Sequence, residues 1–345
     1  MKGLVTDGRG GIFLREDIPM PKMGEYDGLV KTVGCGICNG TDLKLADGHL
    51  KGFGTYPAVL GHEAVGRVIR TGKKVRNYRE GDLVLRSELP DRGQYYSLWG
   101  GFSEYALVTD CDAMEEDGLT IQDVGARSKT VVPDGIDGTD ACMLITLEEI
   151  YSALKRLDMR AGQNVVIAGC GPVGIAMANL CRILGAGKIL LGGHHKARMQ
   201  KALELGADVA VDTREEDLSL RIREEMGKAD LFIDAVGNGT VLSHGLRSVK
   251  PGGVIGIYGI GLRSTQPVAW EDADYCWEIR SVQWPDYGHL VTIQKETADL
   301  VLEGKLHLSD YVTHRLPVED YERGFELVKN REGLKVVLTL SLIHI

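Results

Sequence analysis

The sequence predicts an α/β protein with two domains, the first mostly β and the second built on a doubly wound parallel sheet. Its 345 residues exceed the length at which a single hydrophobic core stops growing. Short apolar runs broken by glycine fill residues 1–147, whereas strand and helix patterns alternate over 148–286. The last segment, 287–345, is predicted to return to the first domain and complete it.

The first domain takes its strands from closely spaced apolar runs. Each run has the length of a strand and is bounded by glycine or polar turn residues. The runs are LVKTVGCG, AVGRVIRTG, GDLVLRSE and GFSEYALVTD. Helical spacing with basic residues towards its end follows over residues 143–157 and predicts a helix that leads into the second domain.

The second domain alternates buried strands with helices, a pattern typical of parallel sheets covered by helices. The predicted strands are NVVIAG, KILLGG, VAVD, ADLFIDAVG and GGVIGIYGI. The predicted helices are PVGIAMANLCRILG and HKARMQKALELGAD. Beyond residue 286 a long helical run and a final strand, KVVLTL, are predicted. The terminal SLIHI continues an apolar strand without a turn signal, and we assign it no function.

Composition excludes several classes of function. The net charge of −9 without a long basic run argues against nucleic acid as the main partner. No window approaches the roughly 18 apolar residues of a membrane span, and the start MKGLVTDGRG lacks the apolar core of a signal peptide. Seven scattered cysteines do not form the pattern of a disulfide framework. We therefore expect a cytoplasmic protein without membrane association.

A glycine-rich loop carries the clearest binding signal. Gly169, Gly171 and Gly174 have the spacing G-x-G-x-x-G, directly after a predicted strand and at the start of a helix. In that context Gly169 permits the tight turn and Gly171 lets the backbone approach a pyrophosphate at the helix N-terminus. With Pro172 and Val173 between them, these glycines predict a dinucleotide site. The alternative is a glycine-rich turn without a ligand.

The end of the next strand bears on which dinucleotide is bound. An acidic residue about 20 positions beyond the loop normally accepts hydrogen bonds from the ribose of NAD. This chain has Gly193 there, which leaves nothing to repel a 2′-phosphate. Donor or cationic side chains follow at His194, His195, Lys196 and Arg198. We therefore predict NADP over NAD; the alternative is a solvated basic start of a helix.

Three residues of the first domain suggest a metal site. Cys38 offers a thiolate, His62 an imidazole and Glu63 a carboxylate, all of which are zinc ligands in proteins. Three protein ligands and one open position are typical of a catalytic zinc rather than a structural one. The alternative for Cys38 is a small buried hydrophobic side chain.

The motifs together resemble a known family. GICNGTDLK, PAVLGHEAVGRV, REGDLV, GGFSEYALV, VVIAGCGPVG and VKPGGVIGIYG occur in the order found in zinc-dependent medium-chain alcohol and polyol dehydrogenases. This resemblance covers nearly the whole chain. It implies a GroES-like catalytic domain, a Rossmann dinucleotide domain, an active site in the cleft between them and a homodimer or homotetramer. By position, Cys38, His62 and Glu63 resemble the catalytic zinc ligands, Thr41 the proton-relay hydroxyl and Asp42 its supporting neighbour.

Four departures from the family pattern matter. One extra residue separates Cys38 from the Thr41–Asp42 pair. A further Cys or Glu ligand is common 24 residues before the glycine loop, where this chain has Ile145; Glu148, Glu149 or a water molecule are the candidate substitutes. No cysteine lies between Cys38 and Cys111, so the structural zinc of many members is expected to be absent. Finally, Lys44 replaces a relay histidine.

The resemblance implies reversible oxidation of a secondary alcohol or polyol to a ketone, with one zinc and a nicotinamide cofactor. Trp99, Tyr95 and Trp284 are expected either to line a substrate cleft or to serve packing, and Cys35 to be a thiol that packs in a turn. Two other functions stay open. One is a zinc-independent NADPH enone or quinone reductase of the same fold, which needs no such ligand set. The other is a non-catalytic NADP-binding protein.

Overall fold

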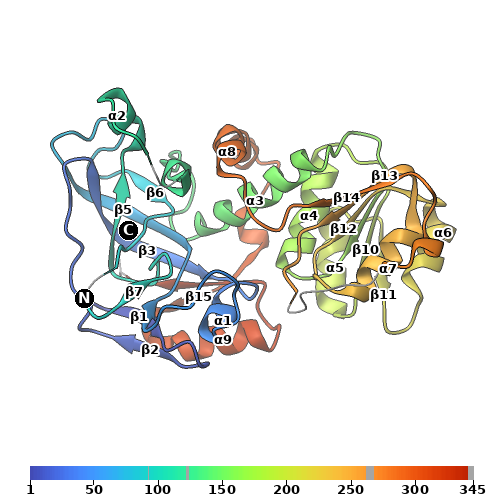
Figure 1. The fold of residues 1–345 in the computed structure, drawn as a ribbon, viewed down its shortest axis with the longest axis horizontal. Helices are drawn as coiled ribbons and strands as arrows, with labels where there is room; N and C mark the ends of the chain where they lie inside the picture. The colour runs from blue at the N-terminus through green and yellow to red at the C-terminus, as the bar shows by residue number, and fades with distance from the viewer. Residues whose placement is uncertain (92, 122–123, 262–267, 341–345) are drawn as a thin grey trace. The chain divides into compact units, whose positions relative to one another are not determined.

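The computed structural model describes residues 1–91, 93–121, 124–261 and 268–340 (Figure 1). The chain divides into two compact units. Unit 1 contains residues 1–148 and 287–345, and unit 2 contains residues 149–286. Within the described ranges, no helix combines the length and the apolarity needed to cross a bilayer. The terminal SLIHI lies outside the described residues.

The described part of unit 1 is built on two β-sheets. The smaller has the order β2 (Ile12–Arg15), β1 (Gly3–Thr6), β4 (Ala58–Val59), β7 (Tyr96–Ser97). The larger has the order β15 (Val312–Pro317), β16 (Lys335–Thr339), β3 (Asp27–Ile37), β5 (Glu63–Thr71), β6 (Leu83–Leu85), and β8 (Tyr105–Thr109) also pairs with β3. The long strand β3 is the centre of this sheet, because it pairs with β16, β5 and β8.

The C-terminal segment completes unit 1, and its red ribbon lies beside the blue N-terminal strands in Figure 1. Strand β16 pairs antiparallel with β3, with Val336 opposite Ile37. Helix α9 packs on β16 and places Phe325 edge-on to Phe102 in the main core. The helices of this unit are α1 (Asp42–Ala46), α2 (Cys111–Glu116), α3 (Cys142–Arg156), which continues into unit 2, α8 (Tyr287–Leu302) and α9 (Tyr321–Lys329).

Unit 2 is a parallel sheet of six described strands. Its order is β11 (Val209–Asp212), β10 (Ile189–Gly193), β9 (Val165–Ala168), β12 (Ala229–Asp234), β13 (Val249–Ile257), β14 (Trp277–Ser281). The chain starts at β9, moves outwards to β11 and then resumes on the other side at β12. This reversal next to the first strand is the feature of doubly wound sheets at which dinucleotides bind. The connecting helices are α4 (Pro172–Ile183), α5 (Lys196–Leu205), α6 (Leu218–Met226) and α7 (Gly239–Ser248).

The predicted fold class is confirmed, with corrections in detail. Helices α6 and α7 and strand β14 were not among the predicted elements. The prediction of Cys35 as a thiol in a turn is wrong. Cys35 lies inside β3 opposite Ala64, with no exposed surface, and packs in the core of unit 1. The turn begins after Ile37, where β3 ends.

Candidate active site and metal centre

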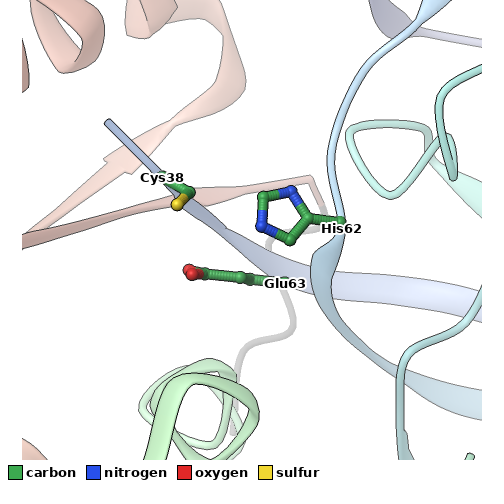
Figure 2. Close-up of side chains that lie close together, drawn as sticks. All are labelled: Cys38, His62 and Glu63. Carbon is green, nitrogen blue, oxygen red and sulfur yellow. The ribbon is translucent and has the colours of Figure 1, made fainter. Parts of the chain in front are cut away.

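Strand pairing brings three potential metal ligands together. Cys38 directly follows β3, His62 directly precedes β5, and Glu63 is the first residue of β5. The two strands are antiparallel, with Gly36 opposite Glu63, so the end of one meets the beginning of the other. The sulfur, nitrogen and oxygen donors of the three side chains lie within 4.8 Å of one another. Figure 2 shows the three side chains converging on a common point.

A buried carboxylate holds two of these ligands. Asp42, at the start of α1, has no exposed surface. Its Oδ2 accepts a hydrogen bond from the backbone N–H of Cys38 at 2.9 Å, and its Oδ1 lies 3.2 Å from His62 Nδ1. Burial alone would lower the pKa of His62, but the Asp42 carboxylate and Cys38 hold it well above its ordinary value. A proton on Nδ1 leaves Nε2 as the donor atom for a metal.

Glu63 has two partners of its own. Its Oε1 accepts from the Thr146 hydroxyl at 2.9 Å, and its Oε2 accepts from Lys335 Nζ at 2.5 Å. All three side chains are buried. Burial would raise the pKa of Glu63 and lower that of Lys335, but each charge shifts the other the opposite way, so the pKa of Glu63 is lowered and that of Lys335 is raised. The pair is therefore ionised. Sequence reasoning found neither Thr146 nor Lys335.

The residues proposed as a further ligand on α3 are placed differently. The Glu148 carboxylate is buried and lies 3.5 Å from an Arg86 guanidinium nitrogen and 3.4 Å from Gln294 Nε2. The Ile145 side chain belongs to the core, and its carbonyl accepts from Arg86 at 3.3 Å. Among the described residues, the donor cluster contains neither Glu148 nor Glu149. The α3 side chain that reaches the cluster is that of Thr146.

Of the other residues of unit 1 that the sequence singled out, some belong to elements beside the Cys38–His62–Glu63 cluster and one packs elsewhere. Thr41 is the N-cap residue of α1, and its hydroxyl makes no capping hydrogen bond. Lys44 lies on the same helix, half-buried, and burial lowers the pKa of its amine. The Trp99 indole lies 5.4 Å from the His62 ring, between centroids, and Trp99 has a left-handed backbone with φ of 63°. Tyr95, by contrast, packs in a separate small core and donates to Asp17.

The glycine loop of unit 2 has the geometry of a phosphate-binding turn. Gly169 follows β9 with φ of 126°, a conformation that side chains disfavour. A Cβ atom at Gly174 would lie 1.9 Å from the carbonyl oxygen of Gly169, so helix and strand approach too closely for any other residue. Gly171 is the N-cap of α4 and has open space around it. Pro172 occupies the first turn, and Val173 is half-buried. Backbone amides at this end of α4 suit a pyrophosphate.

Packing is a second reason why glycine occupies the end of β10. A Cβ atom at Gly193 would lie 2.4 Å from the Cys170 sulfur, so packing against the loop also requires glycine there. In the next strand, Asp212 is the register partner of Gly193. Its carboxylate accepts from Arg214 at 2.7 and 3.1 Å, which lowers the pKa of Asp212 to about 2. Sequence reasoning missed Asp212 and Arg214, although Asp212 ends a predicted strand beside the glycine.

The basic residues after Gly193 lie at the start of α5. His194 is exposed, and His195 is the N-cap of the helix without a side-chain capping bond. Lys196 is exposed and Arg198 is half-buried. In the same unit, Trp284 is 42% exposed and accepts from Arg156 through its carbonyl.

Comparisons with known proteins agree with this geometry. Residues 24–115 match the model of the alcohol dehydrogenase GroES-like domain, and residues 172–283 match that of the zinc-binding dehydrogenase domain. The chain is 27% identical to L-threonine 3-dehydrogenase of Anaeromyxobacter sp. (strain K), with 98% of each chain covered. It is 26% identical to sorbitol dehydrogenase of Ovis aries, with 97% of this chain and 95% of that protein covered.

A solved structure gives the same result. The alcohol dehydrogenase TADH from Thermus sp. ATN1 superposes with a TM-score of 0.81 at 25% identity, over 99% of this chain and 100% of that one. Both domain models, the full-length relatives and the shared fold point the same way. The chain belongs to the zinc-dependent medium-chain dehydrogenase family, as an alcohol or polyol dehydrogenase.

Proposed function

We propose that the protein oxidises a secondary alcohol or polyol reversibly to a ketone, with one catalytic zinc and NADP as the preferred cofactor. The observation that carries the proposal is the convergence of Cys38, His62 and Glu63 beside a buried supporting carboxylate. We assign residues 1–147 and 287–345 to the catalytic domain and 148–286 to the dinucleotide domain. The glycine loop then binds the cofactor, and the cluster binds the metal.

The donor set fits zinc. A thiolate, an imidazole and a carboxylate within 4.8 Å of one another match its preferred ligands, and the buried Asp42 fixes the imidazole as metal-bound histidines require. When bound, zinc supplies Lewis-acid activation of the substrate hydroxyl. Cys38 and His62 would hold the metal, and Glu63 would hold it or balance its charge.

The chain itself handles the proton and the hydride. The Thr41 hydroxyl, which makes no capping bond, would accept the alcohol proton while giving its own proton up towards solvent. A nicotinamide held at the glycine loop would supply the acceptor for the carbon-bound hydrogen and its two electrons, so that the carbinol would be oxidised to a ketone. The Trp99 ring beside His62 limits the water around the reacting atoms.

Three features support NADP as the preferred cofactor. No acidic side chain ends β10, because Gly193 is required there by Cys170. The carboxylate of Asp212, the register partner of Gly193 on β11, is neutralised by Arg214. The Arg214 side chain is 58% exposed and His194 is exposed, so the guanidinium and the imidazole are both accessible to a 2′-phosphate.

The relatives narrow the substrate class. Proteins named sorbitol dehydrogenase and L-threonine 3-dehydrogenase are similar over their full length, which favours a secondary carbinol with a polar neighbouring carbon. Sugar alcohols and amino alcohols are thus the first candidates, ahead of simple secondary alcohols. We further propose a homodimer or homotetramer located in the cytoplasm, where the seven free thiols stay reduced.

A substrate screen tests the proposal. Zinc-loaded protein is assayed with alditols, L-threonine, vicinal diols and simple secondary alcohols, each with NADP and with NAD, and kcat/KM is compared. Turnover of an alcohol that needs zinc and prefers NADP supports the proposal. Zinc-independent reduction of an enone by NADPH would instead identify a reductase of the same fold. Tight NADP binding without any turnover would identify a non-catalytic protein. Light scattering gives the oligomeric state.

A further inference from the structure

Lys335 is a buried cation at the metal cluster that the proposed chemistry does not use. Its Nζ lies 2.5 Å from Glu63 Oε2 and 3.2 Å from the Thr146 hydroxyl. The side chains of Lys335 and Glu63 are each 4% exposed. A lysine this deeply buried is costly unless it is paired. Here its partner is one of the three potential metal ligands, so the ion pair and the metal site share a carboxylate.

The fold supplies this lysine from the far end of the chain. Lys335 is the first residue of β16, whose next residue, Val336, is opposite Ile37 on β3. Glu63 begins β5 on the other side of β3. Strands β16 and β5 therefore lie on either side of β3. The side chains of Lys335 and Glu63 meet over Gly36, which has no side chain to come between them. The arrangement is fixed by the sheet rather than by a flexible loop.

The charges of the site balance only if the lysine is counted. With a metal bound, Cys38, Asp42 and Glu63 each contribute one negative charge, because a ligating thiol is deprotonated. Lys335 contributes one positive charge. Two negative charges remain, which is the amount that a divalent cation neutralises. Without Lys335, three would remain.

We propose that Lys335 is a resident counter-ion of the metal site: it neutralises Glu63 independently of the metal and competes with the metal for the same carboxylate. The lysine therefore has two opposed effects. It stabilises the metal-free protein, because Glu63 would otherwise be a buried, unpaired charge. It also weakens zinc binding, because its positive charge repels the ion and occupies Oε2. Lys335 is a positioning residue, acting through Glu63. This inference rests on the proposed zinc site.

Thermal unfolding with and without zinc tests the proposal. Wild-type protein and the Lys335→Met variant are stripped with a chelator, and the midpoint is measured before and after addition of Zn²⁺. We expect the stripped variant to unfold at a lower temperature than stripped wild type, and zinc to raise its midpoint by more. A chromogenic chelator competition should give at least about tenfold tighter zinc binding in the variant, since one unit charge nearby is worth that much in a buried site.

Two further variants separate this role from simple packing. Lys129 lies in the same unit, with a side chain that is 5% exposed and 3.0 Å from Glu88, so Lys129→Met is the matched control. It should lower the midpoint equally with and without zinc. The double variant Glu63→Gln/Lys335→Met removes both charges and should recover stability relative to Lys335→Met when metal-free. It decides the question if the single variant does not fold.

The outcomes are distinct. The role of Lys335 would be overturned if zinc raised the unfolding midpoint of wild type and Lys335→Met equally. It would also be overturned if the metal-free double variant were no more stable than Lys335→Met. Neither result would affect the zinc site. A wild-type protein that binds no zinc would instead overturn the proposed function itself. A larger rise in the variant, with recovery in the double variant, establishes the resident counter-ion.

Discussion

The Asp42 carboxylate lies 3.2 Å from His62 Nδ1 and is completely buried. The same carboxylate accepts from the backbone N–H of Cys38. One side chain therefore fixes the ring orientation of one ligand and the backbone position of another. Because Asp42 holds the proton on Nδ1, the opposite nitrogen, Nε2, is the one that can lose its proton and bind a metal.

Replacing Asp42 with asparagine should weaken the metal site. An amide accepts through only one atom, so it cannot serve both the Cys38 N–H and the His62 ring. We expect zinc affinity to fall about 10- to 100-fold, the usual effect of losing such a support, with turnover falling in parallel. Zinc competition titration measures the change. Asp47→Asn, at the exposed end of the same helix, is the control. Unchanged affinity in Asp42→Asn would refute the supporting role.

Metal analysis should find one zinc per chain. The described residues contain a single cluster of three donors, and the first domain lacks the cysteines of a structural lobe. Elemental analysis of protein purified without added metal measures the stoichiometry. Removal with a chelator should abolish turnover and leave dinucleotide binding unchanged, since the two sites use different residues. A content near two would contradict the prediction.

Cys38→Ser should lose zinc and activity together. Serine replaces a soft thiolate with a poor neutral ligand, while the backbone contact to Asp42 stays available. Zinc content, turnover and NADP binding by fluorescence titration are measured on one preparation. We expect the first two to fall and the third to stay at the wild-type value. Cys276→Ser, an exposed cysteine of unit 2, is the control. Full activity in Cys38→Ser would show that the metal assignment is wrong.

The sequence predicted the elements whose patterns are local. The strand and helix of the glycine loop have a fixed spacing, and the Cys38 and His62–Glu63 motifs end or begin predicted strands. Helices α6 and α7 were missed because polar residues and interior glycine weaken their helical pattern. Gly245, for example, lies in the middle of α7 and packs against Phe232.

The residues missed at the site come from long-range pairing. Lys335 is 272 positions from Glu63, and nothing in the run KVVLTL distinguishes a buried lysine from one at an exposed strand start. Counting 24 residues back from Gly169 identifies Ile145 as the position of a further ligand. The side chain that contacts Glu63 is that of the next residue, Thr146, so the count missed it by one position. Arg214 follows a predicted strand, but its relation to Gly193 depends on which strands are neighbours in the sheet.

Acid should destabilise unit 1 partly through Asp110. Burial would raise the pKa of Asp110, but hydrogen bonds from Asn77, Arg76 and Ala113 hold it below its ordinary value. A carboxyl with a lowered pKa stabilises the fold above the unfolded pKa of about 3.9 and loses that effect as pH falls through the folded value. Asp110→Asn should therefore lower the free energy of unfolding at pH near 7 by about 1–2 kcal/mol relative to wild type. The variant should accordingly unfold at a lower temperature. The difference should shrink below about pH 4. A constant difference across this range would contradict the prediction.

Arg214 gives the cleanest test of cofactor preference. The substitution Gly193→Asp would add the missing acidic group, but its Cβ would collide with Cys170, so any loss of binding would have two causes. Arg214 is largely exposed and lies in the turn just after β11, where it neutralises Asp212, the register partner of Gly193. Removing its guanidinium leaves the backbone intact and frees the Asp212 carboxylate.

Arg214→Ala should therefore shift the enzyme from NADP towards NAD. The variant loses a charge-assisted contact to the 2′-phosphate, worth about 1.5–3 kcal/mol, which corresponds to about a 10- to 100-fold loss of kcat/KM with NADP. The freed Asp212 carboxylate repels a 2′-phosphate and can accept from ribose hydroxyls, so kcat/KM with NAD should stay equal or rise. Arg221→Ala, which removes an arginine of α6 in the same unit, is the control and should change neither value. Equal losses with both cofactors would show that Arg214 serves only the fold, and a wild-type preference for NAD would overturn the cofactor assignment.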